Sequence, residues 1–590
     1  MERHTAGLDV RAAGRSLPRP WGLALAWAVV EESGRESASA ELGFRDPACE
    51  LPATHGFTLG APLKLEARDP RGTSELFEGE ITGCEVRAGG AGTFSVVRAE
   101  DLAHRLKRGR RVASYQQMSA GEIARSLAGK AGLKIGQVDG TSLVYEFLTQ
   151  PGISDWEFLT HLARQNGFDV FVRAGALHFG PPTTASAAPA RRTRAGQSPF
   201  VLEYGQNLLQ VRSGASLREQ VTGVEVRGWD PERKQPLGAE RTVQDAATRD
   251  VRWKAPGTSV AGQPLRLSSV PRATQHEVEL VADAMAQEVA AGLTELHAVV
   301  RGEPRLRPRS AITLNGLGNQ YGGQYIVTSV RHEYHPETGY TTEVAVSEGD
   351  ERSSAGGPGD AEGGAHRMPG LAPAEVVDIK DPKDQGRVRL KYPWLSDDYV
   401  GDWARTVQLG GSKGGGVVLP EVGDEVLVGF EQGNLDRPYV IGGLYNGVDK
   451  PSPHQVDLLD KTKGTTNRRS FVSKKGHRLE LLDADQGPLG VLLATGDNKF
   501  RIDLDQHGTR VAIHSDGAVV IEAQRGVEVK GNGITLDAGS GSLKLNGSQI
   551  KMSGQQVEVS GTDVKVTGSG AVKVQGGTLA EISAALVKLN

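Results

Sequence analysis

Three short segments contain residue types that could carry out chemistry, and each has a simpler structural interpretation. His332-Glu333-Tyr334-His335 places its histidines three positions apart, whereas the zinc motif HExxH needs a spacing of four to bring both onto one helix face. The segment alternates like a strand, so we interpret it as a surface strand. We expect no metal ion.

Gly410 to Gly414 reads Gly-Gly-Ser-Lys-Gly and resembles a phosphate-binding loop only in part. Such a loop needs serine or threonine after its lysine, because that hydroxyl group binds the accompanying magnesium ion, and here glycine follows. The neighbouring acids Asp397 and Asp398 are interpreted as solvated loop charges rather than as a general acid and base. No Gly-x-Ser-x-Gly nucleophile elbow occurs at a strand-to-helix turn. We therefore expect no catalytic residue and no cofactor.

The composition limits the kind of elements that could position a site. The chain has 590 residues, too many for one hydrophobic core, so at least three domains are expected. Glycine is frequent at 77 residues and aromatic residues make up only 5%, which favours tight turns and thin β-structure. The formal net charge of −4 comes from evenly mixed signs, which argues against nucleic acid as a partner.

The apolar run Trp21 to Val30 follows several arginines and imitates a secretory signal. Glu31 and Glu32 interrupt the path to a cleavage site, so a buried strand is the better interpretation. Cys49 and Cys84 are expected to be free buried thiols, because a chain of this size needs no disulfide. We expect synthesis in the cytoplasm without a signal peptide.

Residues 1–347 show a mixed pattern of strands and short helices. A capping box that begins at Ser119 predicts a short amphipathic helix. Residues 155–163 and 275–293 have apolar residues at helical spacing, and residues 311–346 alternate as strands. This part of the chain is therefore expected to be an α+β domain.

The composition changes abruptly at residues 348–370, where glycine and charged residues replace apolar ones, and this predicts a flexible linker. Residues 371–447 show short alternating strands separated by Asp-Pro, Gly-Gly and Gly-Asn turns, a pattern that suits a small closed barrel. A polar connector at 448–470 leads to the last part of the chain, residues 471–590.

The last part of the chain contains short repeats. From about Thr509 to Val574, apolar residues occur in pairs at positions i and i+2, and the pairs recur every seven to nine residues with glycines between them. In seven of the nine pairs a polar residue separates the two members, so each repeat is expected to form one short strand with one buried face. The residues expected to form this core are Val511, Ile513, Val519, Ile521, Val527, Val529, Ile534, Leu536, Leu543, Leu545, Ile550, Met552, Val557, Val559, Val564, Val566, Val572 and Val574.

Three other folds fit these repeats less well. A coiled coil needs apolar residues three or four apart, and a glycine in every repeat would cost a helix about 1 kcal/mol each. A meander of hairpins would give each strand too little apolar surface for a sandwich. A single-chain solenoid needs about 20 residues per coil. We therefore predict an intertwined trimeric β-helix, in which three chains each supply one wall and bury their pairs together.

The sequence resembles the VgrG-like spike proteins of contractile injection systems, which are related to the hub and spike of contractile-tailed phages. The most specific match lies in the barrel, in DPKDQGRVRLKYPWL (Asp381 to Leu395) and LPEVGDEVLVGFEQGNLDRPYVIGGLYNG (Leu419 to Gly447). The segment QPGISDWEFLTHLARQNGF (Gln150 to Phe168) is similar to the hub domain of that family. The likeness extends from about Phe77 to the end of the chain, with Gly-Asn in a barrel turn where members usually have Gly-Asp.

This resemblance implies a mainly β fold: an α+β hub at 1–347, an OB-fold barrel at 371–447 and the trimeric β-helix needle at 471–590. It implies a homotrimer that joins tube protein and baseplate components to a needle that punctures a target membrane. It also implies that the needle carries a PAAR-type tip protein, a small cone on its end, or effector cargo. The expected tip-protein interface, for which a frayed terminus is the alternative, is Leu586, Val587, Leu589 and Asn590.

Three function classes follow from these patterns. The favoured one is a structural, non-enzymatic spike, assembled into a phage, type VI or phage-tail-like injection particle and delivered to a target envelope. The second is a β-helical receptor-binding or carbohydrate-acting tail fibre, which needs aromatic side chains that the rod from Thr509 onward lacks. The third is a spike whose hub region hides a catalytic function.

Overall fold

The computed structural model describes residues 7–589, apart from residues 35, 55, 70–71, 218–219, 245, 254–262, 347–369 and 412–413. The chain divides into two compact units, Met1–Pro451 and Ser452–Asn590. Strands predominate among the described elements, which confirms a mainly β fold. The linker predicted at 348–370 lies outside the described residues except for Gly370.

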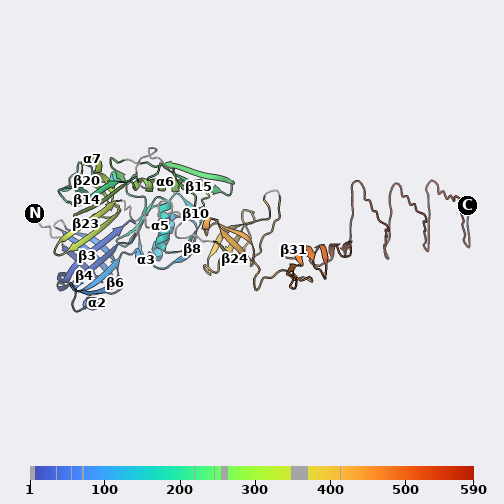
Figure 1. Ribbon diagram of the computed structural model, residues 1–590, viewed down its shortest axis with the longest axis horizontal. Coiled ribbons are helices and arrows are strands. Elements are labelled where there is room, and N and C mark those ends of the chain that lie inside the picture. The colour runs from blue at the N-terminus through green and yellow to red at the C-terminus, as the bar shows by residue number, and fades with distance from the viewer. Residues whose placement is uncertain are drawn as a thin grey trace. The chain divides into compact units, whose positions relative to one another are not determined.

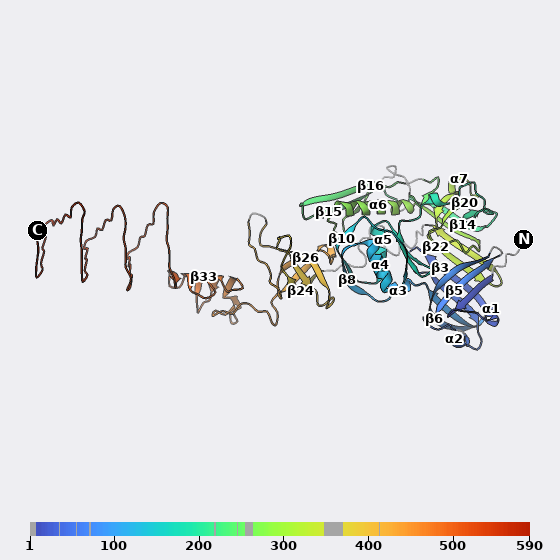
Figure 2. The ribbon, with the colours of Figure 1, turned by 180° about the vertical axis from the view of Figure 1, so that it is seen from behind.

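An antiparallel sheet of 11 strands is the largest element of the first unit (Figures 1 and 2). Its strands alternate between apolar and polar residues, so one face buries side chains such as Val30, Leu42 and Val344. The run that imitates a signal peptide lies in strand β3 of this sheet from Leu25 onward, as predicted, whereas Trp21 to Ala24 lie in a short helix. In spatial order the strands are β14 (Leu208–Ala215), β19 (Thr294–Arg301), β23 (Gly339–Val346), β22 (Ser329–His335), β3 (Leu25–Ser33), β4 (Ser39–Arg45), β7 (Gly92–Glu100), β6 (Gly72–Gly89), β5 (Pro62–Asp69), β1 (Gly7–Ala12) and β2 (Arg15–Ser16).

Two helices with complete capping boxes form a second core. In α4 (Ala120–Lys130) and α5 (Asp155–Gln165), the serine before the helix and the glutamate at its third position exchange hydrogen bonds, which fixes where each helix begins. Their apolar faces pack together with short strands on either side. These strands are β8 (Arg111–Ser119), β9 (Lys134–Val138), β10 (Val144–Ile153), β11 (Asp169–Arg173) and β12 (Ala176–Gly180).

The longest described helix, α6 (Gln275–Ala291), packs on a small three-stranded sheet. A capping box at Thr274 starts it, and its apolar residues at helical spacing face the sheet. The sheet consists of β16 (Gln235–Thr242), β15 (Gly223–Asp230) and β18 (Leu265–Leu267). A neighbouring four-stranded sheet consists of β13 (Val201–Glu203), β20 (Ala311–Asn315), β21 (Gly323–Ile326) and β17 (Arg249–Asp250). The short helices are α1 (Arg19–Ala24), α2 (Leu51–Thr54), α3 (His104–Lys107), α7 (Gly318–Tyr321), η1 (Ala185–Ala187) and η4 (Glu431–Gly433).

A closed five-stranded barrel completes the first unit, and it confirms the barrel expected after residue 371. Its interior is filled by small and branched apolar side chains together with Tyr392 and Tyr399. Val112 and Phe147, from the β8 and β10 pair, pack against the same core. Around the barrel the strands are β24 (Leu371–Asp378), β25 (Val388–Lys391), β26 (Val400–Thr406), β28 (Pro438–Gly443) and β27 (Glu425–Phe430).

The second unit begins with a short hairpin and a five-stranded antiparallel meander. Within the described residues 516–589, no residue belongs to a helix or strand, and Figure 1 shows this segment as an extended trace that turns back and forth. The repeats after Ser515 therefore form no strand pairs within one chain. The hairpin is β29 (Leu459–Asp460) and β30 (Thr465–Thr466), and the meander is β31 (Arg468–Val472), β32 (Arg478–Asp483), β33 (Leu489–Ala494), β34 (Phe500–Asp505) and β35 (Arg510–Ser515).

Both cysteines are free, as expected, but both are exposed, so the expectation of buried thiols is wrong. Cys49 lies in a turn with a left-handed φ of 56°. Cys84 lies on the exposed part of β6, where its Sγ is 3.3 Å from the Phe57 carbonyl oxygen. No described helix has the length and apolarity that crossing a membrane requires.

Gly79→Ala should destabilise the large sheet, because a Cβ at position 79 would lie 2.1 Å from the Glu100 carbonyl oxygen. We expect the overpacking to cost about 1 to 3 kcal/mol and to lower the midpoint of thermal unfolding. Gly83→Ala is the matched control on the same strand, because its Cβ would meet only the Arg98 Cβ at 3.6 Å. Equal midpoints for the two variants would contradict the prediction.

Candidate functional site

His332 is the most buried of the residues that the sequence offers for chemistry. It lies in a strand, β22, as predicted, but its side chain is only 1% exposed, so the expectation of a surface position is wrong for this residue. Its Nε2 lies 3.1 Å from the Leu306 carbonyl oxygen and its Nδ1 lies 2.9 Å from the Tyr340 hydroxyl oxygen. Burial lowers the pKa of His332 well below its ordinary value, so the ring is neutral and satisfied. These contacts give it a structural role in packing β22.

The other candidates are loop residues. Asp397 and Asp398 are exposed, in agreement with solvated loop charges. Ser412 and Lys413 lie outside the described residues, and the flanking glycines lie in the loop between β26 and β27. Across the part of the chain that the structure describes, no three His, Cys, Asp or Glu side chains are grouped so that they could hold a metal ion.

The turn between β24 and β25 is organised by Asp381, the first residue of the motif that matches best. Its carboxylate accepts hydrogen bonds from the backbone amides of Lys383 at 3.0 Å, Gln385 at 2.8 Å and Arg387 at 3.1 Å. The Arg387 guanidinium donates to the same carboxylate at 2.6 Å, and it holds the pKa of Asp381 well below its usual range. The motif therefore encodes a rigid turn rather than a catalytic acid.

The barrel is joined to strand β10 by a small buried polar cluster. The hydroxyl groups of Thr149 and Tyr399 lie 2.8 Å apart, and the Thr149 backbone amide donates to Asp436 Oδ2 at 3.2 Å. The other carboxylate oxygen, Asp436 Oδ1, is buried and has no hydrogen-bond partner. The hydroxyl group of the fully buried Tyr392 also has none. The cluster thus fixes the orientation of the barrel at the cost of one poorly solvated carboxylate.

Burial raises the pKa of Asp436 from its ordinary 3.8 to about 6, and the two hydrogen bonds from Thr149 offset only part of this effect. The nearby Asp402 acts in the same direction as burial, whereas the Arg437 cation opposes it. Burial likewise raises the pKa of Tyr392 and Tyr399 above the ordinary value of 10. Burial therefore shifts all three groups towards their neutral forms, and Asp436 is still ionised above about pH 6.

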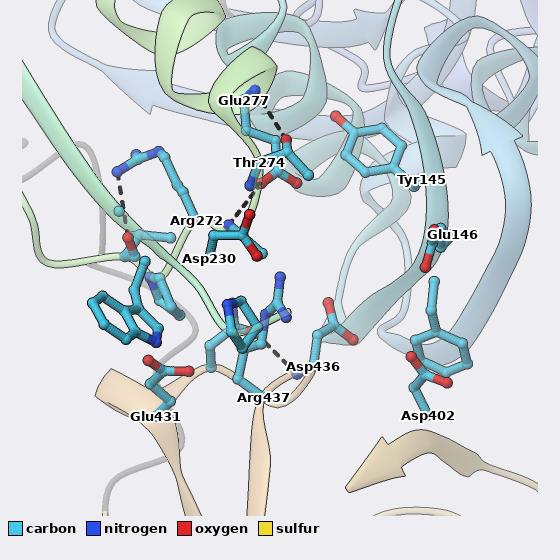
Figure 3. Close-up of a pocket in the computed structure, with 18 of the residues that line it drawn as sticks. Tyr145, Glu146, Asp230, Arg272, Thr274, Glu277, Asp402, Glu431, Asp436 and Arg437 are labelled. Carbon is cyan, nitrogen blue, oxygen red and sulfur yellow. Dashed lines mark hydrogen bonds between the residues drawn. The ribbon is translucent and has the colours of Figure 1, made fainter. Parts of the chain in front are cut away.

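A cleft of about 650 Å³ lies beside this cluster, between the barrel and the elements β10, β15 and α6. Figure 3 shows Tyr145 and Glu146 facing it from β10, and Glu431, Asp436 and Arg437 facing it from the barrel. Its lining has seven carboxylates and six cations but no histidine or cysteine.

Several of the carboxylates in this cleft already have structural partners. Glu277 caps α6 by accepting from the Thr274 amide at 3.1 Å, and Glu232 pairs with Lys383 at 2.8 Å. Glu431 accepts from the Tyr439 hydroxyl group at 3.0 Å. The cleft is therefore a polar seam within the first unit, and its geometry provides no nucleophile paired with a base.

The eighteen residues predicted to form the needle core are all exposed in the single chain, between 53% and 78%. Only the first pair, Val511 and Ile513, lies in a strand, β35, where it faces Leu504 and Ile502 of β34. The other sixteen are brought against no strand of this chain. Their burial in a trimer stays a prediction.

At the C-terminal end, Leu586, Val587 and Leu589 are exposed, with 46% to 88% of each residue accessible. Asn590 lies outside the described residues. The assignment of this end as a tip-protein interface also stays a prediction.

The sequence analysis missed two features of functional interest. The contact of Thr149 with Asp436 joins residues 287 positions apart, and no local pattern could have revealed it. The meander upstream of the repeats had a signal, because Leu479 and Leu481, like Ile502 and Leu504, are also apolar pairs at i and i+2.

Two known families match parts of the chain. The family described as the Alg8 N-terminal domain matches residues 50–336. The type VI secretion system/phage-baseplate injector OB domain matches residues 372–445, which coincide with the closed barrel. Each match covers less than half of the chain.

Curated relatives match the chain over short segments. VgrG5 of Pseudomonas aeruginosa, a type VI secretion system spike protein, is 29% identical over 138 residues, which make up 21% of this chain and 17% of that protein. VgrG3 of Vibrio cholerae, also a type VI secretion system spike protein, is 31% identical over 114 residues, which make up 17% of this chain and 11% of that protein. The chain thus matches less than a fifth of the length of either relative.

A solved chain of the Francisella PdpA–VgrG complex, in its half-lidded form, has a similar fold at 9% identity, with a TM-score of 0.52. The similarity covers 87% of this chain and 88% of that chain. The fold and the matched barrel define a protein built around a phage-baseplate OB domain. Within that class the barrel and short segments of the chain are similar to VgrG spike proteins, which confirms the resemblance inferred from its motifs.

Asp436→Asn should change how the stability of the barrel depends on pH. Because the pKa of Asp436 is raised in the folded state, its contribution to stability is fully present below the ordinary value of 3.8 and is lost as the pH rises through about 6. We expect the wild type to lose about 1 to 3 kcal/mol relative to the asparagine variant over this range. The measurement is urea denaturation of the full chain at several pH values, with barrel amides followed by hydrogen exchange.

Asp397→Asn is the matched control for this experiment, because it removes one carboxylate from an exposed loop of the same barrel. It should leave the pH profile unchanged. Parallel profiles for wild type and Asp436→Asn would refute the role assigned to the buried carboxylate.

Proposed function

We propose that this chain is the structural, non-enzymatic spike of a contractile injection system and that it works as a homotrimer. The observation that carries the proposal is the combination of a baseplate-type OB barrel with nine exposed apolar pairs, eight of which have no strand partner in their own chain. Two such residues per repeat cannot form a core alone, whereas three chains winding together would enclose them. The names of the curated relatives support the same function.

The proposed division of labour follows the chain. Residues 1–347 form the hub that meets tube protein and baseplate components, and residues 348–370 lead to the barrel at 371–447, which forms a collar. The connector at 448–470 leads to the needle at 471–590, which punctures a target membrane. The polar exterior expected for this rod suits passage through water and an envelope.

The same proposal includes cargo. The apolar end formed by Leu586, Val587 and Leu589 would suit a PAAR-type tip protein, because three copies would present a flat apolar surface. The solved complex of similar fold pairs VgrG with PdpA, and this supports effector-like partners for spikes of this kind. The spike would be made in the cytoplasm without a signal peptide and assembled into an injection particle.

A receptor-binding or carbohydrate-acting tail fibre is the alternative. It gains no support from the rod, which has no aromatic residue from Thr509 onward. Catalysis in the hub gains none from the described cleft, whose acids are largely engaged in caps and ion pairs.

The purified full chain should be a trimer. Light scattering coupled to size-exclusion chromatography should give three times the chain mass of 62.7 kDa, and the needle should resist dissociation by SDS, because its core is shared by all chains. A stable monomer under mild conditions would end the proposal.

The full chain should not cleave peptidoglycan. Zymography against a lysozyme standard should give no clearing band at the position of the spike. This measurement matters because the family match at residues 50–336 carries a name unrelated to spikes. A clearing band that persists in repurified protein would show that the hub has an enzymatic function.

A further inference from the structure

The five-stranded meander of the second unit carries two straight apolar rows on one face. In an antiparallel sheet, residues directly opposite each other point to the same side, so the printed strand registers define each row. Nine of the ten residues in these rows are apolar, and the tenth is an arginine on the first strand. The rows are Arg469, Leu481, Val491, Leu504 and Val511, and Phe471, Leu479, Leu493, Ile502 and Ile513.

These rows are uncovered in the single chain. Eight of the nine apolar residues are between 40% and 67% exposed, which makes them an exposed apolar patch of the kind that marks an interaction surface. Arg469 does not interrupt the apolar surface with a bare charge, because it forms an ion pair with Asp483 at 2.6 Å. The meander therefore has one fully formed apolar face without a cover.

The opposite face of the meander is covered by the connector at β31 and β32. The connector crosses it, and Arg468 donates to the Ser452 carbonyl oxygen at 2.9 Å. His454 lies 2.8 Å from the carboxylate of Glu480, which is completely buried. Because the Val456 amide donates to His454 Nδ1, the proton is on Nε2 and is donated to Glu480. The uncovered apolar rows therefore lie on the face away from the connector.

The two rows run directly into the repeats. The first members of successive pairs are Leu479, Val491, Ile502 and Val511, so the spacing falls from 12 to 11 to 9 residues, and the next pair, at Val519, follows after 8. Strand pairing within the chain stops at this point, after Ser515. A step of seven or eight, which nearly all the repeats have, leaves too few residues for both a strand and a hairpin turn, whereas the steps of nine to twelve upstream allow both.

We propose that the apolar face of the meander is where three copies of this chain first meet, and that it sets the register from which the repeats wind together towards the C-terminal end. The inference rests on the proposed trimer and adds an order to its assembly. Its occupant is the same face of two further copies, since the pattern is continuous with the pairs that the trimer would bury.

Two physical arguments favour this order. The meander is folded before the chains meet, so docking its face costs little backbone entropy, whereas each repeat must be ordered as it assembles. The repeats also resemble one another, so three chains could pair one repeat out of step at little cost. The meander lacks this ambiguity, because its rows contain unique residues such as Phe471 and Arg469.

The test compares single aspartate substitutions in the full chain. Ile502→Asp places a charge in the apolar row, and Arg501→Asp is its matched control, since Arg501 is the adjacent exposed residue on the opposite face of β34. Val564→Asp places the same charge in a late repeat. Each variant is titrated by mass photometry, and its C-terminal half is probed by limited proteolysis.

We expect Ile502→Asp to raise the concentration needed for trimer formation by at least about tenfold. Arg501→Asp and Val564→Asp should assemble like the wild type, but the trimer of Val564→Asp should be cleaved sooner beyond its substitution. Hydrogen exchange of the meander amides shows whether Ile502→Asp still folds, and it should, because Ile502 is 40% exposed in the single chain.

The inference and the proposed function fail in different ways. A monomeric wild type would end the proposed function. A trimeric wild type with a monomeric Val564→Asp variant would place the first contact in the repeats and overturn the inference, as would full assembly of Ile502→Asp. If the meander amides of Ile502→Asp lose their protection from hydrogen exchange, the variant has not folded there. Leu481→Asp, which places the charge in the other row, then takes its place in the same assay.

Discussion

Two apolar side chains per repeat, with no strand partner in the same chain, are the constraint on which the second unit depends. Water can satisfy the backbone groups of residues 516–589, but it cannot bury their valines, isoleucines and leucines. In the proposed trimer, the rod takes its core from other chains. The polar residues between the pairs and the glycines between the repeats follow from the same constraint, because they provide an outer face and sharp turns.

The first unit solves a different problem, which is how to hold a small barrel against a larger body. Val112 and Phe147 pack against the barrel core and bury apolar surface there. Because the hydrophobic effect is not directional, this contact alone does not fix the orientation of the barrel. The hydrogen bonds of Thr149 with Tyr399 and Asp436 fix the orientation of the barrel, because hydrogen bonds require a narrow range of distances and angles. The large cleft beside them keeps the rest of the seam polar, as is common where domains within a chain meet.

The parts of this fold that could be predicted are those whose signals are local. Capping boxes at Ser119 and Ser154 fix the starts of α4 and α5 within the sequence, and the barrel and the repeats have regular alternation. The burial of His332 could not be predicted, because its partner carbonyl at Leu306 comes from a loop 26 residues away. The meander was not predicted for another reason: its apolar pairs are separated by turns of variable length and do not recur at a fixed period.

The connector gives the second unit a mechanical property as well as a fold. A pull on the chain at Ser452 passes through Arg468 into β31 and through His454 and Glu480 into β32, so two strands share the load from the start. A hydrogen bond to a charged group is worth about 1.5 to 3 kcal/mol, more than the net value of one ordinary hydrogen bond. Tension would therefore reach the sheet as shear across two strands instead of peeling its edge strand away, and sheets resist shear well because many hydrogen bonds must break together.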